Sequence, residues 1–426
     1  MIHSEPRVTA AYTAAGWKDS GMHVPYHYTA ASVITPIPDS GSLSASRAAN
    51  GITPVLKSLA DRVNELAQRA ARLSDQAEVT NLQDTYGYAV DRKLWDQLAE
   101  LFAGNGTLEL GLRGVYVGKA SIRHALDQFG PQGLRDGERN DHVYLQTIVS
   151  VAPDGRTAKA RGVELIMSSA PGGRNGELRE GVFENTFVKQ DAAWKIQSVH
   201  FYPRMIVDAA AGWAKSAKPA PGPSKEFPPD RPPTATYKIY PKFAVAPFHF
   251  DNPVTGRPPQ YPEGVASSLS TMAGARQAAA AAQPMIGPAI RNPADLEARL
   301  VKVERSLIAA EAYDTSENLI GAYGYYLDES PGDVASLFMQ PRRNSTSERS
   351  VFVNQILQPV IDVTPDGKSA KVRARLLDLG GTSGGAGFWK AGTLEGQIVL
   401  EQGKWRFQRV RSTSGWSAHY PAGWAQ

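Results

Sequence analysis

The sequence predicts an α+β fold in two related domains, and three observations lead to this expectation. In each half of the chain, helical patterns come first and antiparallel strand patterns follow. Motifs of the first half recur in the same order in the second half. Between the halves lies a segment with 16 of the chain's 30 prolines, which is too proline-dense and too long for an ordinary surface loop.

Apolar spacing predicts three helices ahead of the first strands. The first begins near Pro54, and its apolar residues repeat in alternating steps of three and four up to Leu73, as in a heptad seam. A second helix is expected from about Asp75 to Val90, and a third from Trp95 to Phe102. The heptad seam leaves two interpretations open: the first helix packs on its own domain, or it pairs with another helix.

The pattern then changes to strands. Residues 107–110 and 114–118 predict two short strands, and residues 121–129 predict a further helix. Four longer strands follow, at residues 143–151, 158–168, 181–189 and 194–202. Turn sequences such as Pro153-Asp-Gly-Arg separate them, so neighbouring strands are expected to pair antiparallel.

The second half repeats the first closely enough to indicate a duplicated domain. The segment 81–91 matches 318–328, and 151–159 matches 363–371. Further pairs are Gly181 with Gly392, Glu184 with Glu395, Trp194-Lys-Ile-Gln with Trp405-Arg-Phe-Gln, and Gly212-Trp-Ala with Gly423-Trp-Ala. The separation between matching residues falls from 237 to 212, so the second copy lacks 25 residues. These correspond to the short strands and helix of residues 106–129, which predicts a truncated second domain.

These patterns divide the chain into four parts. Residues 1–50 are expected to form an N-terminal arm or a poorly ordered tail, and residues 51–215 the first domain, with the intact pocket. Residues 216–292 form a proline-rich linker, whose aromatic residues indicate that part of it wraps along a domain surface. Residues 293–426 form the second domain.

Composition excludes several classes of protein. The chain has no cysteine, which excludes disulfides, zinc ribbons, iron–sulfur clusters and thiol catalysis. Its net charge of +4 comes without a basic cluster, which argues against nucleic-acid binding. No run of about 18 apolar residues and no signal-peptide pattern occurs, so we expect a soluble cytoplasmic protein, with the periplasm left open. No metal-ligand spacing appears, so no metal is expected.

The motifs of the first domain, taken in order, resemble the SnoaL-like branch of the nuclear transport factor 2-like superfamily. The resemblance rests on Tyr-Gly-Tyr-x-x-Asp at residues 86–91, the following Trp-x-x-Leu-x-x-Leu-Phe, Gly-x-Tyr-x-Gly-Lys-x-x-Ile at 114–122, the Asp141-His142 strand start and the Pro-Asp-Gly-x-x-Ala-Lys hairpin. It covers residues 75–215 well and 293–426 in part. It implies two tandem cone-shaped domains, each a curved antiparallel sheet wrapped around helices, the cystatin-like α+β barrel.

The resemblance also implies an activity. Enzymes of this family are lyases, dehydratases, isomerases, cyclases or epoxide hydrolases that act on small, often aromatic or polycyclic molecules without metal or cofactor. Asp91 and His142 fall on the positions of its Asp–His pair. A carboxylate in an apolar pocket would orient the imidazole and stabilise the imidazolium that forms when the histidine takes a proton. Two alternatives stay open: Asp91 caps the next helix, and His142 is a surface residue at a strand start.

Several other residues are expected to bind the substrate: Tyr86, Tyr88, Trp95, Tyr144, Glu164, His200 and Tyr202. The aromatic ones either stack on an aromatic substrate or belong to the core. Glu164 and Glu184 either supply a second acid or base or lie on solvated faces. In the second copy Asp328 keeps the carboxylate but Asn354 replaces the histidine, so that domain is expected to be structural.

The function expected from this sequence is that of a cofactor-independent lyase, dehydratase or isomerase acting on a small hydrophobic molecule. A non-catalytic small-molecule-binding or assembly protein of the same fold is the alternative. Neither nucleic acid nor membrane is expected as a partner. The two domains form an intrachain pseudo-dimer, or the whole chain forms a homodimer.

Overall fold

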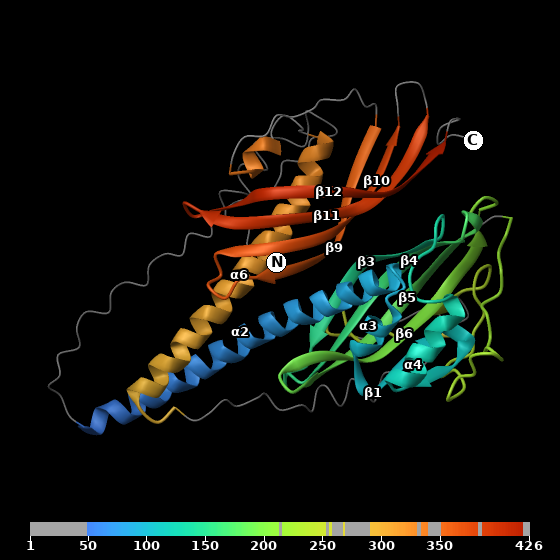
Figure 1. Cartoon of the computed structure of the whole chain (residues 1–426). Coiled ribbons are helices and arrows are strands. Elements are labelled where there is room, and N and C mark those ends of the chain that lie inside the picture. The colour runs from blue at the N-terminus through green and yellow to red at the C-terminus, as the bar shows by residue number, and fades with distance from the viewer. Residues whose placement is uncertain are drawn as a thin grey trace. The chain divides into compact units, whose positions relative to one another are not determined.

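The computed structural model describes residues 49–212, 215–252, 255–257, 267–268, 290–329, 334–339, 351–381 and 386–420. The chain divides into two compact units, with residues 58–306 in one and residues 307–426 in the other. Each unit combines a helix-led segment with a sheet that contains long antiparallel strands, which confirms the α+β prediction (Figure 1). The expected N-terminal arm lies outside the described residues, apart from its last two.

A single helix, α2, runs from Ala49 to Asp91, so the prediction of two helices with a break before Asp75 is wrong. The chain near that position has neither glycine nor proline to interrupt the backbone hydrogen bonds. Asp75 is buried and accepts hydrogen bonds from Lys189 Nζ at 2.5 Å and Trp194 Nε1 at 3.0 Å. The aspartate therefore binds α2 to the strands instead of starting a new helix.

The first unit contains a six-stranded sheet in the order β2-β1-β6-β5-β4-β3. Neighbouring strands are antiparallel except β1 and β6, which pair in parallel. The strands are β1 (Phe102–Leu110), β2 (Val115–Val117), β3 (Arg139–Val151), β4 (Thr157–Ala170), β5 (Arg174–Gln190) and β6 (Ala193–Asp208). Two short helices, α3 (Trp95–Glu100) and α4 (Lys119–Leu126), and two single turns, η1 (Gly111–Arg113) and η2 (Asp127–Phe129), complete this part.

The hydrophobic core of the first unit lies between the helices and one face of the sheet, its inner face. Its buried members include Leu98 of α3 and Ile122 of α4, packed with Phe183, Phe187 and Ile196 of the sheet. Full burial stabilises a side chain of this size by about 1.5–3 kcal/mol. The core thus holds α2, α3 and α4 over the sheet and fixes the walls of the site described below.

The outer face of this sheet is covered by residues 227–250 of the linker. Thr234 donates its backbone N–H to Glu109 of β1 at 2.7 Å, and His249 Nδ1 lies 2.7 Å from Glu184 of β5. The guanidinium of Arg161 lies 3.8 Å from the ring centroid of Phe248. This agrees with the prediction that part of the linker wraps along a domain surface. Two short strands, β7 (Ala244–Val245) and β8 (Ser267–Ser268), pair in parallel within the linker.

The second unit has a smaller sheet of four antiparallel strands in the order β12-β11-β10-β9. They are β9 (Val351–Val363), β10 (Ser369–Gly381), β11 (Gly387–Glu401) and β12 (Lys404–Tyr420), and they follow α6 (Pro293–Glu329) and the turn η3 (Val334–Leu337). A parallel bridge joins Phe338 to Phe407. It corresponds to the parallel pairing of Phe102 with Ile196, so the start of β1 has a counterpart among the described residues of the second unit.

No helix among the described residues is both long enough and apolar enough to cross a membrane.

Candidate active site

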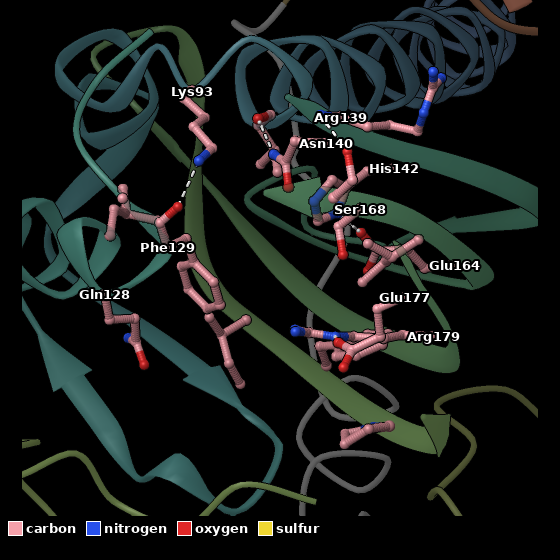
Figure 2. A pocket seen from close by; sticks show the side chains of 18 of the residues that line it. Lys93, Gln128, Phe129, Arg139, Asn140, His142, Glu164, Ser168, Glu177 and Arg179 are labelled. Carbon is pink, nitrogen blue, oxygen red and sulfur yellow. Dashed lines mark hydrogen bonds and ion pairs between the residues drawn. The ribbon is translucent and has the colours of Figure 1, made fainter. Parts of the chain in front are cut away.

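A cavity of about 530 Å³ lies in the first unit, between the helices and the inner face of the sheet. Strands β3 to β6 form one wall, and the end of α2, the start of α3, and the turns η1 and η2 form the other. In the close view of Figure 2, His142, Glu164 and Ser168 face Lys93 and Phe129 across this space. The cavity contains both apolar surface and several charged side chains, so it can hold a small organic molecule.

A histidine and a glutamate meet in the sheet wall of the cavity. His142 of β3 and Glu164 of β4 lie close to each other across the paired strands, and Nδ1 of the imidazole is 2.6 Å from Oε1 of the carboxylate. Both side chains are largely buried, with 14% and 8% of their surface exposed. In this contact the neutral imidazole donates its Nδ1–H to the carboxylate, which makes Nε2 the basic nitrogen.

Asp91 acts on the backbone of the same histidine. It is buried at the end of α2, and its Oδ1 accepts the backbone N–H of His142 at 2.7 Å. Asp328 makes the equivalent contact in the second unit, where its Oδ1 accepts the backbone N–H of Asn354 at 2.8 Å. The aspartate thus joins the helix end to the first long strand in both units, whether or not a histidine is present.

Two predictions about Asp91 change as a result. The sequence pairs its carboxylate with the imidazole, whereas the structure places Glu164 at Nδ1 of His142 and Asp91 at the backbone of His142. The alternative that Asp91 caps the next helix is wrong, because α3 has Leu94 at its N-cap and no side-chain cap. The prediction that His142 lies in a pocket agrees with the structure, which makes it part of the cavity wall.

Two tyrosines face the glutamate from the cavity wall. Burial, with the charge of Glu164 as a second cause, raises the pKa of both Tyr86 and Tyr144 well above the usual range. Both therefore stay neutral phenols that donate hydrogen bonds. Tyr86 Oη forms no hydrogen bond within the described part of the chain, and the residue lines the cavity, so its hydroxyl is available to a ligand.

The other predicted substrate-binding residues divide between the two faces of the sheet. Trp95 lines the cavity and donates its Nε1–H to the carbonyl of Gly130 at 2.9 Å. Tyr88 is half-buried and lies outside the cavity wall. His200 and Tyr202 also lie outside it, stacked on each other with ring centroids 3.8 Å apart. Alternation along β6 turns their neighbours toward the cavity instead: Val199, Phe201 and Pro203.

The two glutamates left open by the sequence are both buried, so the interpretation as solvated faces is wrong for each. Glu164 is in the cavity wall. Glu184 is on the outer face, where Arg161 Nη1 lies 2.6 Å from its Oε1 and His249 Nδ1 lies 2.7 Å from its Oε2. The sequence cannot separate the two, because both occupy long strands and only the pairing of the strands decides which face each one takes.

Charged residues at the cavity escape prediction from the sequence. Lys93, in the turn after α2, pairs with Glu138 and donates to the carbonyl of Phe129 at 2.5 Å. Arg113, Arg139 and Arg179 also line the cavity. They come from four separate segments and share no motif, so their convergence depends on the fold. Among the described residues, no group of three or more His, Asp or Glu side chains is arranged to hold a metal ion.

The chain has an α+β fold with a six-stranded and a four-stranded sheet, and its first unit encloses a cavity of about 530 Å³. A family model described as SnoaL-like domain matches residues 71–200 and 342–411, one region in each unit. The chain therefore contains two regions similar to the SnoaL-like domain, as its motifs indicate. No curated protein sequence matches the chain.

Solved structures with a similar fold cover about a third of the chain. A putative scytalone dehydratase from Novosphingobium aromaticivorans is 18% identical over 36% of this chain and 96% of its own, with a TM-score of 0.29. A cystatin-like NTF2-like protein from the same organism is 21% identical over 35% and 92%, with a TM-score of 0.27. ActVI-ORFA from Streptomyces coelicolor is 19% identical over 30% and 95%, also with a TM-score of 0.27.

Proposed function

We propose that the first unit is a cofactor-independent lyase or isomerase that acts on a small hydrophobic, aromatic or polycyclic molecule. The observation that carries the proposal is the contact between His142 and Glu164 in the wall of a cavity of about 530 Å³. A carboxylate at Nδ1 fixes the tautomer of the imidazole and stabilises the imidazolium. A histidine held in this way presents Nε2 as the proton acceptor, which is the arrangement that general base catalysis needs.

The proposed reaction begins with proton transfer. Nε2 of His142 takes a proton from a substrate carbon next to a carbonyl or a leaving group. The electron pair of the broken C–H bond forms a carbon–carbon double bond as the leaving group departs, or moves onto the carbonyl oxygen as an enolate. In an elimination the leaving group departs with the electron pair of its own bond to carbon and can take the proton from the imidazolium; in an isomerisation the imidazolium returns the proton to another carbon.

Tyr86 is the proposed hydrogen-bond donor to the oxygen on which charge develops. Its hydroxyl is neutral, buried and close to the histidine–glutamate pair, and a donor at that place stabilises the transition state more than the ground state. The aromatic rings of the wall, which include Trp95 and Phe129, supply surface for an aromatic substrate.

The second unit is proposed to have no such activity. By the spacing of the repeat, the positions of His142 and Glu164 are taken by Asn354 and Leu376, neither of which accepts a proton. The backbone contact of Asp328 is kept, which fits a role in folding. The second unit is therefore a structural companion of the first.

The test uses the full-length chain and a library of small aromatic and polycyclic molecules. Ligands that stabilise the protein against heat are incubated with it in deuterated water, and elimination or deuterium incorporation is followed by NMR. We expect His142→Asn and Glu164→Gln each to lower the rate by about a hundredfold or more while ligand binding persists. His124→Gln, at an exposed histidine outside the cavity, is the control that keeps the wild-type rate.

Asp91→Asn separates the two roles considered for the aspartate. If it acts by holding the backbone of His142, this variant, which retains an acceptor oxygen, loses less activity than His142→Asn. Equal losses in both variants, with folding intact, would show that the Asp91 charge itself takes part in the chemistry. Ligands that bind without any exchange or turnover would point instead to a non-catalytic binding protein.

A further inference from the structure

Most of the charged side chains around the cavity are paired with one another. Lys93 pairs with Glu138, and Arg139 lies 3.2 Å from Asp141. Glu177 forms ion pairs with two cations: with Arg179, and with Lys218, whose Nζ lies 3.1 Å from Oε2 of Glu177. The first two pairs are neutral, whereas the two cations at Glu177 share one carboxylate, so each of these cations already has an acidic partner.

Arg113 of η1 is the exception among the cations that are not fully exposed. Among the residues that the structure describes, its guanidinium forms one hydrogen bond, from Nη1 to Gln128 Oε1 at 2.7 Å. Within the described ranges, no ion pair joins it to a carboxylate, and Glu177, the carboxylate whose charge acts on the pKa of Arg113, is already paired with Arg179 and Lys218. Burial is the largest cause that lowers the pKa of Arg113, with the charge of Arg179 next, yet an arginine stays protonated in a protein.

The guanidinium is also held in a fixed orientation. Gln128 donates from Nε2 to the carbonyl of Ala125 at 2.7 Å, which turns its Oε1 toward Arg113. Beneath the guanidinium lies the ring of Phe129, with 5.3 Å between the guanidinium carbon and the ring centroid. One of the five N–H donors of Arg113 is used by Gln128, so the others remain for a ligand. A half-buried charge without a counter-ion is costly, and an anionic ligand removes that cost.

We propose that Arg113 binds the carboxylate of the substrate, so that the cavity selects aromatic or polycyclic carboxylic acids over neutral molecules of the same shape. The planar guanidinium matches a carboxylate with two parallel N–H···O bonds. A single unpaired guanidinium balances the one negative charge of a carboxylate. A phosphate dianion has two negative charges, and the described cavity wall offers no second half-buried cation without an acidic partner. The proposal deepens the proposed function and rests on the same cavity.

The test measures binding, so that it does not depend on turnover. The probes are a naphthalene carboxylate and its neutral carboxamide, which share ring system and size. We expect the full-length wild-type protein to bind the carboxylate about tenfold or more tightly than the carboxamide in titration calorimetry. Arg113→Gln removes that preference and leaves carboxamide binding as it was, and Arg113→Lys retains part of it.

Two controls separate this proposal from its alternatives. Arg135→Gln removes an exposed cation from the edge of the same cavity, and it keeps the preference if a direct contact with Arg113 is responsible. His142→Asn keeps the preference as well, even though it abolishes turnover. Equal affinity of the two probes for the wild-type protein, or an unchanged preference in Arg113→Gln, overturns the carboxylate site. A wild-type protein that prefers the carboxylate but shows no turnover contradicts the proposed function and leaves the carboxylate site standing. Turnover without that preference contradicts the carboxylate site and leaves the proposed function standing.

Discussion

His142 shows how one residue takes its chemistry from contacts that are far apart in the sequence. Glu164, on the neighbouring strand, holds Nδ1 of the imidazole, while Asp91, at the end of α2, holds the backbone N–H. The first contact sets the tautomer and the basicity of Nε2. The second joins the strand to the helix end, so the ring is fixed relative to the opposite wall of the cavity.

His200 is a second histidine with a very different environment. Burial lowers its pKa to about 3, far below the usual 6.5. Its ring stacks on Tyr202, and its Nδ1 lies 3.5 Å from Oε2 of Glu109, at the outer limit of a hydrogen bond. Burial also raises the pKa of Glu109, which is bound to Thr234. Between pH 6.5 and about 3, His200 therefore stays neutral in the folded protein, whereas the unfolded chain would protonate it.

This difference predicts an acid-sensitive stability. Between pH 6.5 and about 3 the unfolded chain binds a proton at His200 and the folded protein does not, so stability falls as the pH falls. Relative to His200→Gln, we expect the wild-type protein to lose about 2 kcal/mol of unfolding free energy between pH 7 and pH 5. Urea denaturation at both pH values measures it. Glu109 is present in both proteins, so its own titration largely cancels. Parallel pH profiles would contradict the assignment.

At the scale of the elements, both sheets contain matching irregularities. In β5 the register against β6 shifts between Glu180 and Gly181, and in β11 the register against β12 shifts between Ala391 and Gly392. A Cβ on Gly181 would lie 2.5 Å from the carbonyl oxygen of Tyr202, and one on Gly392 would lie 2.4 Å from that of Thr413. The repeated glycine in the sequence thus marks a place where two backbones approach too closely for a side chain.

Replacing these glycines by alanine is expected to destabilise the protein. Gly181→Ala and Gly392→Ala each force a backbone shift, which we expect to lower the unfolding free energy by about 1–3 kcal/mol. Gly104→Ala in β1 is the matched control, because nothing lies within 4 Å of its Cβ position, and it changes stability by about 0.5 kcal/mol or less. Chemical denaturation compares the three variants. A Gly181→Ala protein as stable as the control would refute this explanation of the repeat.

At the scale of the whole molecule, the two units differ in what covers their sheets. Arg161 and Glu184 form a cross-strand pair on the outer face of the first sheet, and Arg373 and Glu395 form the same pair in the second. The first pair is buried under linker residues 247–249, whereas the second is about half exposed. The linker therefore does more than join two domains, because it completes the outer layer of the first.

The covering segment is expected to resist proteolysis. Lys238 and Lys242 are exposed trypsin sites inside it. Tyr240, between them, donates its backbone N–H to the carbonyl of Arg204 in β6 at 2.8 Å, so cleavage needs local unfolding. Arg161→Met removes the contacts to Phe248 and Pro247 and is expected to speed cleavage at both lysines severalfold. Arg373→Met is the matched control with no expected effect. Mass spectrometry of timed digests follows both sites, and rapid cleavage of the native wild-type protein at both would contradict the packing.

Much of the fold can be predicted from the sequence, because helices, strands and turns are each marked by the spacing and type of neighbouring residues. Alternating apolar residues and explicit turns predict the four long strands, and the ordered repeat predicts a second, smaller sheet. The predicted end of the second helix at Val90 lies one residue from the end of α2. The predicted break before Asp75 is wrong. An aspartate between apolar stretches is typical of a helix start, and the sequence does not show that Lys189 and Trp194 bind this one inside a continuous helix.

By itself, the sequence determined the α+β class, the ordered repeat and the resemblance to SnoaL-like domains, and it left open whether His142 lies in a pocket or at the surface. Only the tertiary structure decided that Glu164 holds the imidazole, that Arg113 faces the same cavity without a counter-ion, and that His200 lies on the other face. Strand periodicity shows which side chains share a face, but the pairing of distant strands decides whether that face is inside or outside. The partner of a charge is likewise set by contacts between segments, which no local pattern records.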